Sequence, residues 1–181
     1  AGSALASGSL ASSAFINTHI ATAAAVLGWI IPEWARNKAT TTVGAATGAV
    51  AGLVAITAPC AFVAPWAAAV IGVVAAILII KAVAFWEGRG IDDPVGAISV
   101  HGVCGCLGVI SVGLFADGTY GEGWNGTKGA VTGLFYGGGA DQLLAQVVGV
   151  MSCLIVVGGV AFIVMKLIRM LPGSWNLRIE P

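Results

Sequence analysis

The sequence predicts an all-α, polytopic membrane protein, and three observations support this prediction. Apolar residues make up 58% of the 181 residues and charged residues only 9%, whereas soluble domains carry about 25% charge. The mean hydropathy is +0.97. The apolar residues are gathered into runs, several of them long enough to cross a hydrocarbon core of roughly 30 Å. A formal net charge of zero gives no reason to expect a nucleic-acid partner.

Five apolar segments are expected to form helices in a lipid bilayer. Residues 1–9 are small and polar, as at a helix end and loop, and the expected spans are residues 10–31, 43–57, 65–85, 94–116 and 143–167. Pro32 is expected to end the first span. Residues 43–57 are short for a crossing, so a re-entrant segment competes with a full span. Gly44, Gly48 and Gly52 recur at every fourth position there and predict close helix packing.

The basic residues predict the orientation of these segments. If every segment crosses, seven of the eight Lys and Arg residues lie on one side of the membrane and only Lys128 lies on the other. A re-entrant segment at 43–57 would instead put Arg36 and Lys38 opposite Lys81 and Arg89, so the charges favour a full span. Because cytoplasmic loops are enriched in Lys and Arg, the pattern predicts a multi-pass protein of the cell membrane with residues 171–181 as a cytoplasmic tail.

His101 is the main candidate for a functional residue. It lies in residues 94–116, which carry no charged side chain. Asp93 and Pro94 are expected to be the N-cap and first residue of this helix. A carboxylate accepts hydrogen bonds from the unpaired N–H groups of the first turn, and proline has no N–H that would need a partner there. His101 then lies about a third of the way into the bilayer. An ionisable group at that depth is a functional candidate by default, and a hydrogen bond between packed helices is the alternative.

Glycine and polar residues near these positions leave further alternatives open. Gly102, Gly105 and Gly108 fit either close helix contact or an open lumen beside His101. In the first span, Asn17, Thr18 and His19 each need a partner within the protein. His19 is nearer a helix start, so a packing or interfacial role is favoured for it.

Several motifs resemble the ammonium transporter family (Amt/Mep/Rh). They are GSALA at residues 2–6, INTHIATAAA at 16–25, TGAVAGLVAIT at 47–57, DDPVGAISVHGVCG at 92–105 and GLFYGGGADQLLAQ at 133–146. The resemblance covers essentially the whole chain. It corresponds to the second half of the family's eleven-helix fold with inverted repeats, from the end of the sixth transmembrane helix through the eleventh. It implies a homotrimer whose protomers each hold a narrow hydrophobic pore.

The resemblance also implies roles for individual residues. His101 matches one of two histidines that share a hydrogen bond midway along the pore, and its partner belongs to the fifth helix, outside this chain. Thr57 matches a threonine near the pore, and Ser3 matches the serine of the external ammonium recruitment site. Asp93 matches the acidic cap of the tenth helix, a structural role. Gly96 stands near where many bacterial members carry an aspartate, which bears on packing at the cytoplasmic pore exit.

The expected function is therefore transport of ammonium or ammonia, with no enzymatic activity, no cofactor and no metal ion. A regulatory partner is expected at the cytoplasmic face. Two other functions stay open. The same fold can act as an ammonium sensor with little flux, and a signalling domain beyond Pro181 would favour that function. A packing-only membrane subunit would use His101 as a bond between helices, and His101→Ala would then lower stability without changing ammonium handling.

Overall fold

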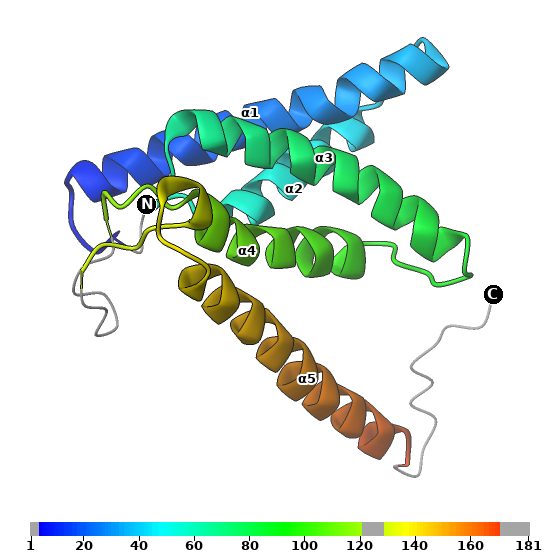
Figure 1. The fold of residues 1–181 in the computed structure, drawn as a ribbon. Helices are drawn as coiled ribbons and strands as arrows, with labels where there is room; N and C mark the ends of the chain where they lie inside the picture. Colours follow the sequence, from blue (N-terminus) through cyan, green and yellow to red (C-terminus); the bar gives the residue numbers. More distant parts are fainter. Residues whose placement is uncertain (1–3, 121–128, 171–181) are drawn as a thin grey trace.

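The computed structural model describes residues 4–120 and 129–170, and all of its regular elements are helices. They are α1 (Ser9–Asn37), α2 (Thr42–Thr57), α3 (Pro65–Glu87), the π-helix η2 (Ala97–Cys104), α4 (Gly105–Phe115), the 3-10 helix η4 (Leu134–Tyr136) and α5 (Asp141–Arg169). In the described residues, α1, α3, η2 with α4, and α5 are each long and apolar enough to cross a membrane. Figure 1 shows α1 to α4 lying together, with α5 leaving at an angle. The predicted all-α membrane fold is confirmed.

The first helix is longer than the sequence predicted. Pro32 lies inside α1, which continues to Asn37, so the prediction that Pro32 ends the span is wrong. Proline removes one backbone hydrogen bond, but contacts from the next helix hold the turns that follow it. The Glu33 carboxylate accepts hydrogen bonds from the Thr41 hydroxyl at 2.8 Å and the Thr41 N–H at 3.2 Å. Thr41 is the N-cap of α2, so one carboxylate joins the two helices.

The glycine stripe of α2 packs against α1 as predicted. Gly44, Gly48 and Gly52 are all buried. A Cβ at Gly44 would collide with the Glu33 side chain, and one at Gly52 would collide with the Ala21 carbonyl oxygen. These contacts show that α2 packs antiparallel to α1 as one continuous helix. α2 itself is a shorter apolar helix than the four long ones.

α3 completes the packed core. Gly72 of α3 lies so close to the Ala21 backbone that any side chain would collide with it. Small residues allow such approach in membrane helices, where packing rather than hydrophobic burial drives association. The buried Asn17 side chain donates to the carbonyl oxygens of Cys60 at 2.8 Å and Val63 at 2.7 Å. It therefore ties the α2–α3 connection to α1, and its partners lie inside the protein as expected.

The helix that carries His101 begins later than predicted. Gly96 has a left-handed backbone (φ +67°) and is the N-cap of η2, and its N–H donates to the Asp93 carbonyl oxygen at 3.0 Å in a tight turn. The assignment of Asp93 as N-cap and Pro94 as first helical residue is therefore wrong. The Asp93 carboxylate still serves the first turn of the helix, because it accepts hydrogen bonds from the N–H groups of Ile98 at 3.1 Å and Ser99 at 2.9 Å.

α5 differs from the other long helices in having no buried residue. It packs on α4, where Gly113 lies against the backbone of Leu143. The expected span of 143–167 lies within α5, and the predicted tail at 171–181 lies outside the described residues. A large apolar surface of α5 is therefore left uncovered by the described part of the chain.

Candidate pore site

His101 lies on an unusual turn of helix. The Gly96 carbonyl oxygen accepts hydrogen bonds from the N–H groups of both Val100 at 2.7 Å and His101 at 3.3 Å. The second bond joins residues five positions apart, which defines a π-helical turn. Such turns are rare and are found frequently at functional sites. The left-handed Gly96, which any residue with a side chain would adopt only with strain, makes this start possible.

The helix formed by η2 and α4 has a packed face and an open face. Ser99 and Cys104 are fully buried, and η2 contacts both α2 and α3. His101, in contrast, is exposed. A Cβ on Gly105, one turn after His101, would meet nothing within 4 Å, and a Cβ on Gly102 would meet only one backbone oxygen at 3.8 Å. His101 therefore stands on a face that no described residue covers.

Gly108 has the opposite role to the glycines beside His101. A Cβ at this position would collide with the carbonyl oxygen of Ala55 in α2. The two explanations that the sequence allowed for these glycines therefore both apply, at different positions. Gly102 and Gly105 leave space beside the histidine, whereas Gly108 lets α4 approach α2.

The structure does not bring Thr57 close to His101. Val50 and Val100 line one cleft, while Gly108 lies on Ala55, so α2 and the η2–α4 helix run parallel. Thr57 therefore lies about two helical turns, or roughly 10 Å, beyond the level of His101. It is exposed, and its hydroxyl donates to the Leu53 carbonyl oxygen at 2.7 Å. Ser3, the expected recruitment residue, lies outside the described residues.

Asp93 is a charged group at the start of the His101 helix. Partial burial acts to raise the pKa of Asp93, but hydrogen bonds from the backbone N–H groups of Ser99 and Ile98 outweigh it and leave the pKa below its usual value. The carboxylate is thus held ionised next to the free N–H groups and positive dipole end of the helix. Asp93 therefore stabilises the start of the helix through its side chain, although the N-cap residue is Gly96.

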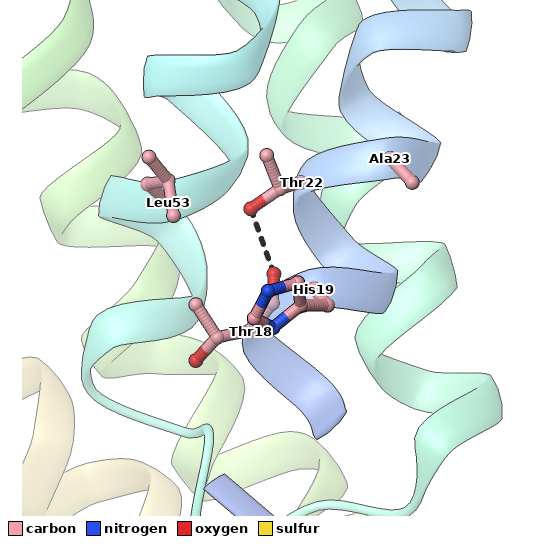
Figure 2. A pocket seen from close by; sticks show the side chains of 5 residues that line it. All are labelled: Thr18, His19, Thr22, Ala23 and Leu53. Carbon is pink, nitrogen blue, oxygen red and sulfur yellow. Dashed lines mark hydrogen bonds between the residues drawn. The ribbon is translucent and has the colours of Figure 1, made fainter. Parts of the chain in front are cut away.

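One ring nitrogen of His19 has a hydrogen-bond partner within its own helix. Its Nδ1 lies 2.9 Å from the Phe15 carbonyl oxygen, and its ring centroid lies 4.2 Å from that of Phe15. Figure 2 shows His19 beside Thr18 and Thr22 of α1, with Leu53 of α2 across a small cavity of about 310 Å³. His19 is exposed, so the described residues do not pack around it, and the interfacial role stays a prediction.

A cleft of about 570 Å³ lies at the other end of α2 from Thr57, and sequence reasoning missed it. α2, α3 and the turn before η2 form its walls, and its lining includes Trp29, Trp86, Glu87, Asp92 and Ser99. These residues lie as far as 70 positions apart in the sequence, from Trp29 to Ser99, so no local spacing could indicate them. The acidic pair at residues 92 and 93 is the local signal of this cleft, and the cap expected for Asp93 explains only one of the two.

Taken together, the apolar helices and their packing define a polytopic helical membrane protein, with His101 exposed on one of the helices long enough to span a membrane. The chain belongs to the Ammonium Transporter Family, which it matches over residues 1–181. An ammonium transporter of Mycobacterium tuberculosis (strain ATCC 25618 / H37Rv) is 42% identical over 173 residues, which cover 96% of this chain and 36% of that protein.

Solved structures agree with this assignment. The crystal structure of Saccharomyces cerevisiae Mep2 superposes with a TM-score of 0.81 at 30% identity, covering 90% of this chain and 36% of that one. A structure described as a Sensor Amt Protein superposes with a TM-score of 0.79 at 32% identity, covering 94% of this chain and 40% of that one. The chain thus spans well under half the length of the proteins it matches. Its family is one of transporters, and it is a multi-pass membrane protein.

Proposed function

We propose that the polypeptide carrying this chain conducts ammonium or ammonia across the cell membrane through a narrow apolar pore, with His101 on the pore wall. The observation that supports this most directly is the exposure of His101 on an open helix face in an otherwise apolar segment. A polar group at that depth facing lipid is unfavourable, so the face must line a cavity or meet another part of the protein. Family membership supports ammonium as the cargo.

The physics of an apolar pore explains the role of a histidine there. A cation entering such a pore loses its hydration at a large cost in free energy, whereas neutral ammonia loses little. A neutral imidazole offers one N–H and one lone pair, so His101 can accept a proton from ammonium or hold ammonia by a hydrogen bond. A second histidine from the other half of the fold would complete the pair. Thr57 and Ser3 are proposed to lie nearer the pore mouth, Ser3 in an external recruitment site.

Ammonium-evoked current in proteoliposomes tests the proposal. The polypeptide that carries this chain is compared with its His101→Ala variant, and His19→Ala serves as a matched control because it removes an exposed histidine from another helix. We expect a saturable current that potassium does not reproduce, unchanged by His19→Ala and altered in rate or ion selectivity by His101→Ala. An unchanged rate and selectivity in His101→Ala would exclude His101 from the conduction path.

An ammonium sensor is the second candidate function. The similarity to a solved Sensor Amt Protein, at 32% identity, favours keeping it. A sensor binds ammonium without much flux, so it would show ammonium-dependent stabilisation of the folded protein but no current. The same proteoliposome preparation, examined by current and by thermal unfolding, separates the two functions.

We further propose that the C-terminal ends of α1, α3 and α5 face the cytoplasm. We also propose that the protein is a homotrimer with a cytoplasmic regulatory partner. The C-terminal ends of α1, α3 and α5 lie towards one side of the molecule in Figure 1. Arg36, Lys166 and Arg169 lie in the last turns of α1 and α5, as the positive-inside rule requires for a cytoplasmic side. Labelling of single cysteines placed at residues 38 and 119 in intact cells tests the orientation, and only residue 119 should react from outside.

A further inference from the structure

The helix that carries His101 changes its winding shortly after the histidine. η2 is π-helical, and α4 follows it from Gly105. At the start of η2 the His101 N–H donates to the Gly96 carbonyl oxygen, five positions back. At its end the Gly105 N–H donates to the His101 carbonyl oxygen, four positions back as in an α-helix. A π-helical turn holds more residues than an α-helical one, so each residue of η2 rotates the chain by less than about 100°.

This smaller rotation decides which side chains of η2 face the neighbouring helices. Cys104 marks the packed face, because it is fully buried and its thiol donates to the Ala75 carbonyl oxygen of α3. In an α-helix, Ser99 would lie about 140° around from Cys104 and His101 only about 60°. Smaller steps bring Ser99 closer to Cys104 and carry His101 farther from it. The structure has this arrangement, since Ser99 is fully buried and His101 is exposed.

Gly96 and Asp93 together hold the wide turn in place. The left-handed backbone of Gly96, at φ +67°, is one that residues with a side chain rarely adopt. A Cβ at this position would also lie 2.7 Å from a methyl group of Val100. The Asp93 carboxylate binds the N–H groups of Ile98 and Ser99, five and six positions further on. The winding of η2 is therefore fixed by the backbone of one glycine and the side chain of one aspartate.

We propose that Gly96 is a positioning residue for His101: its left-handed backbone selects the π-helical winding, and this winding aims the imidazole at the open face. Added Cβ atoms at Gly102 and Gly105 would meet almost nothing there among the described residues, so an imidazole on this face is free to bond ammonium or ammonia. A side chain at position 96 favours a right-handed backbone and hence an α-helical start. That start would turn His101 towards the packed face. The inference rests on the proposed transport function, in which His101 lines the pore.

Three versions of residue 96 in one background test the role of its backbone. The background is Val100→Ala, which removes the methyl group that a Cβ at position 96 would meet. Within it, the glycine protein is compared with Gly96→Ala, which disfavours a positive φ, and with Gly96→Asn, which tolerates one. A thiol is introduced by His101→Cys or by Ser99→Cys, and its reaction with a small thiol reagent is followed in lipid nanodiscs by mass spectrometry. The buried native Cys104 serves as the internal standard.

Gly90→Ala is the matched control for backbone strain. Gly90 also has a left-handed backbone, at φ +69°, but it precedes the His101 helix, and a Cβ there would meet nothing within 4 Å in the described part of the chain.

In the glycine protein we expect the thiol at position 101 to react faster than the thiol at position 99. Gly96→Ala should lower the ratio of the two rates about tenfold, as for the cost of a left-handed backbone in a residue with a Cβ. Gly96→Asn and Gly90→Ala should leave the ratio unchanged. A merely structural glycine would lower Tm on substitution and leave the ratio intact.

An unchanged ratio in Gly96→Ala would overturn the positioning role, and so would an equal fall in Gly90→Ala. Should Gly96→Ala not fold, Gly96→Asn decides. Folding with an unchanged ratio supports the need for a left-handed backbone at this position, and a lowered ratio contradicts it.

Ammonium-evoked current in versions that retain His101 keeps the positioning role apart from the transport function. A lowered ratio with unchanged current supports positioning and contradicts a place for His101 in the conduction path. Altered current with an unchanged ratio contradicts positioning. A parent polypeptide without current contradicts transport, and the labelling still decides the winding of η2.

Discussion

The most apolar stretches of α3 and α5 have the same mean hydropathy of 2.7, yet they are buried to very different extents. In the most apolar stretch of α3, 33% of the residues are buried, against 0% in α5. The difference lies in what their glycines meet. Gly72 of α3 lies on the Ala21 backbone, whereas a Cβ at Gly149, Gly158 or Gly159 of α5 would meet nothing within 4 Å. Hydropathy therefore identifies a membrane helix, but small residues in contact with another backbone identify its packed face.

The largest expected effect is at the tightest contact of the packed group. Gly72→Leu places a side chain where the Ala21 backbone already lies, and backbone cannot move aside as a flexible side chain can. We expect a loss of about 3 kcal/mol or more in stability, at the upper end for overpacking. Thermal unfolding of the polypeptide in detergent measures it. Gly159→Leu on α5 is the control, and a similar loss there would contradict the difference between the two helices.

Removing the Asn17 side chain, which bonds α1 to the α2–α3 connection, should have the next largest effect on stability. Asn17→Leu leaves the carbonyl oxygens of Cys60 and Val63 without the donor they now have, at a cost of about 1–3 kcal/mol for a buried site. The same unfolding measurement checks it. Ser152→Ala on α5, where the residue is exposed, should change Tm little. An unchanged Tm in Asn17→Leu would mean that the hydrogen bonds from Asn17 do not hold the α2–α3 connection against α1.

Asp93 should have a smaller, pH-dependent effect. Its pKa is lower in the folded protein than in the unfolded chain, so its contribution is fully present above the unfolded value and is lost as pH falls through the folded one. Asp93→Ala should therefore cost about 1 kcal/mol at neutral pH, as for loss of a capping side chain, and the difference from unmodified protein should shrink below about pH 4. Unfolding measured at pH 7 and pH 3.5 tests this. A difference that stays constant with pH would assign the effect to packing.

The smallest expected stability effect is at His101, which stands on the open face. His101→Ala should change stability by roughly 0.5 kcal/mol or less, as for other exposed positions, although it is expected to alter transport. Cys104→Ser, one turn away on the packed face and fully buried, should destabilise more. A large loss of stability in His101→Ala would support the packing-only function instead.

The sequence was informative wherever local chemistry alone decides the structure. The close packing of the α2 glycines and the need of Asn17 for a partner inside the protein could be predicted. In lipid, polar groups must find partners within the protein, and small residues mark the faces where helices pack closely. The end of α1 could not be predicted from Pro32, since the helix continues through a contact between Glu33 and Thr41 across two elements. The cleft lined by Trp29, Trp86, Asp92 and Ser99 could not be predicted either, because its lining residues are distant in sequence and meet only in the folded chain.

The sequence by itself determined the all-α membrane class, the order of the apolar segments and the candidacy of His101, because these follow from hydropathy and from the cost of polar groups in lipid. Only the tertiary structure decided which glycines give contact and which give space, since Gly105 and Gly108 are alike as residues and differ in what faces them. It also decided where the His101 helix begins, because the left-handed Gly96 and the Asp93 carboxylate act together through a folded turn.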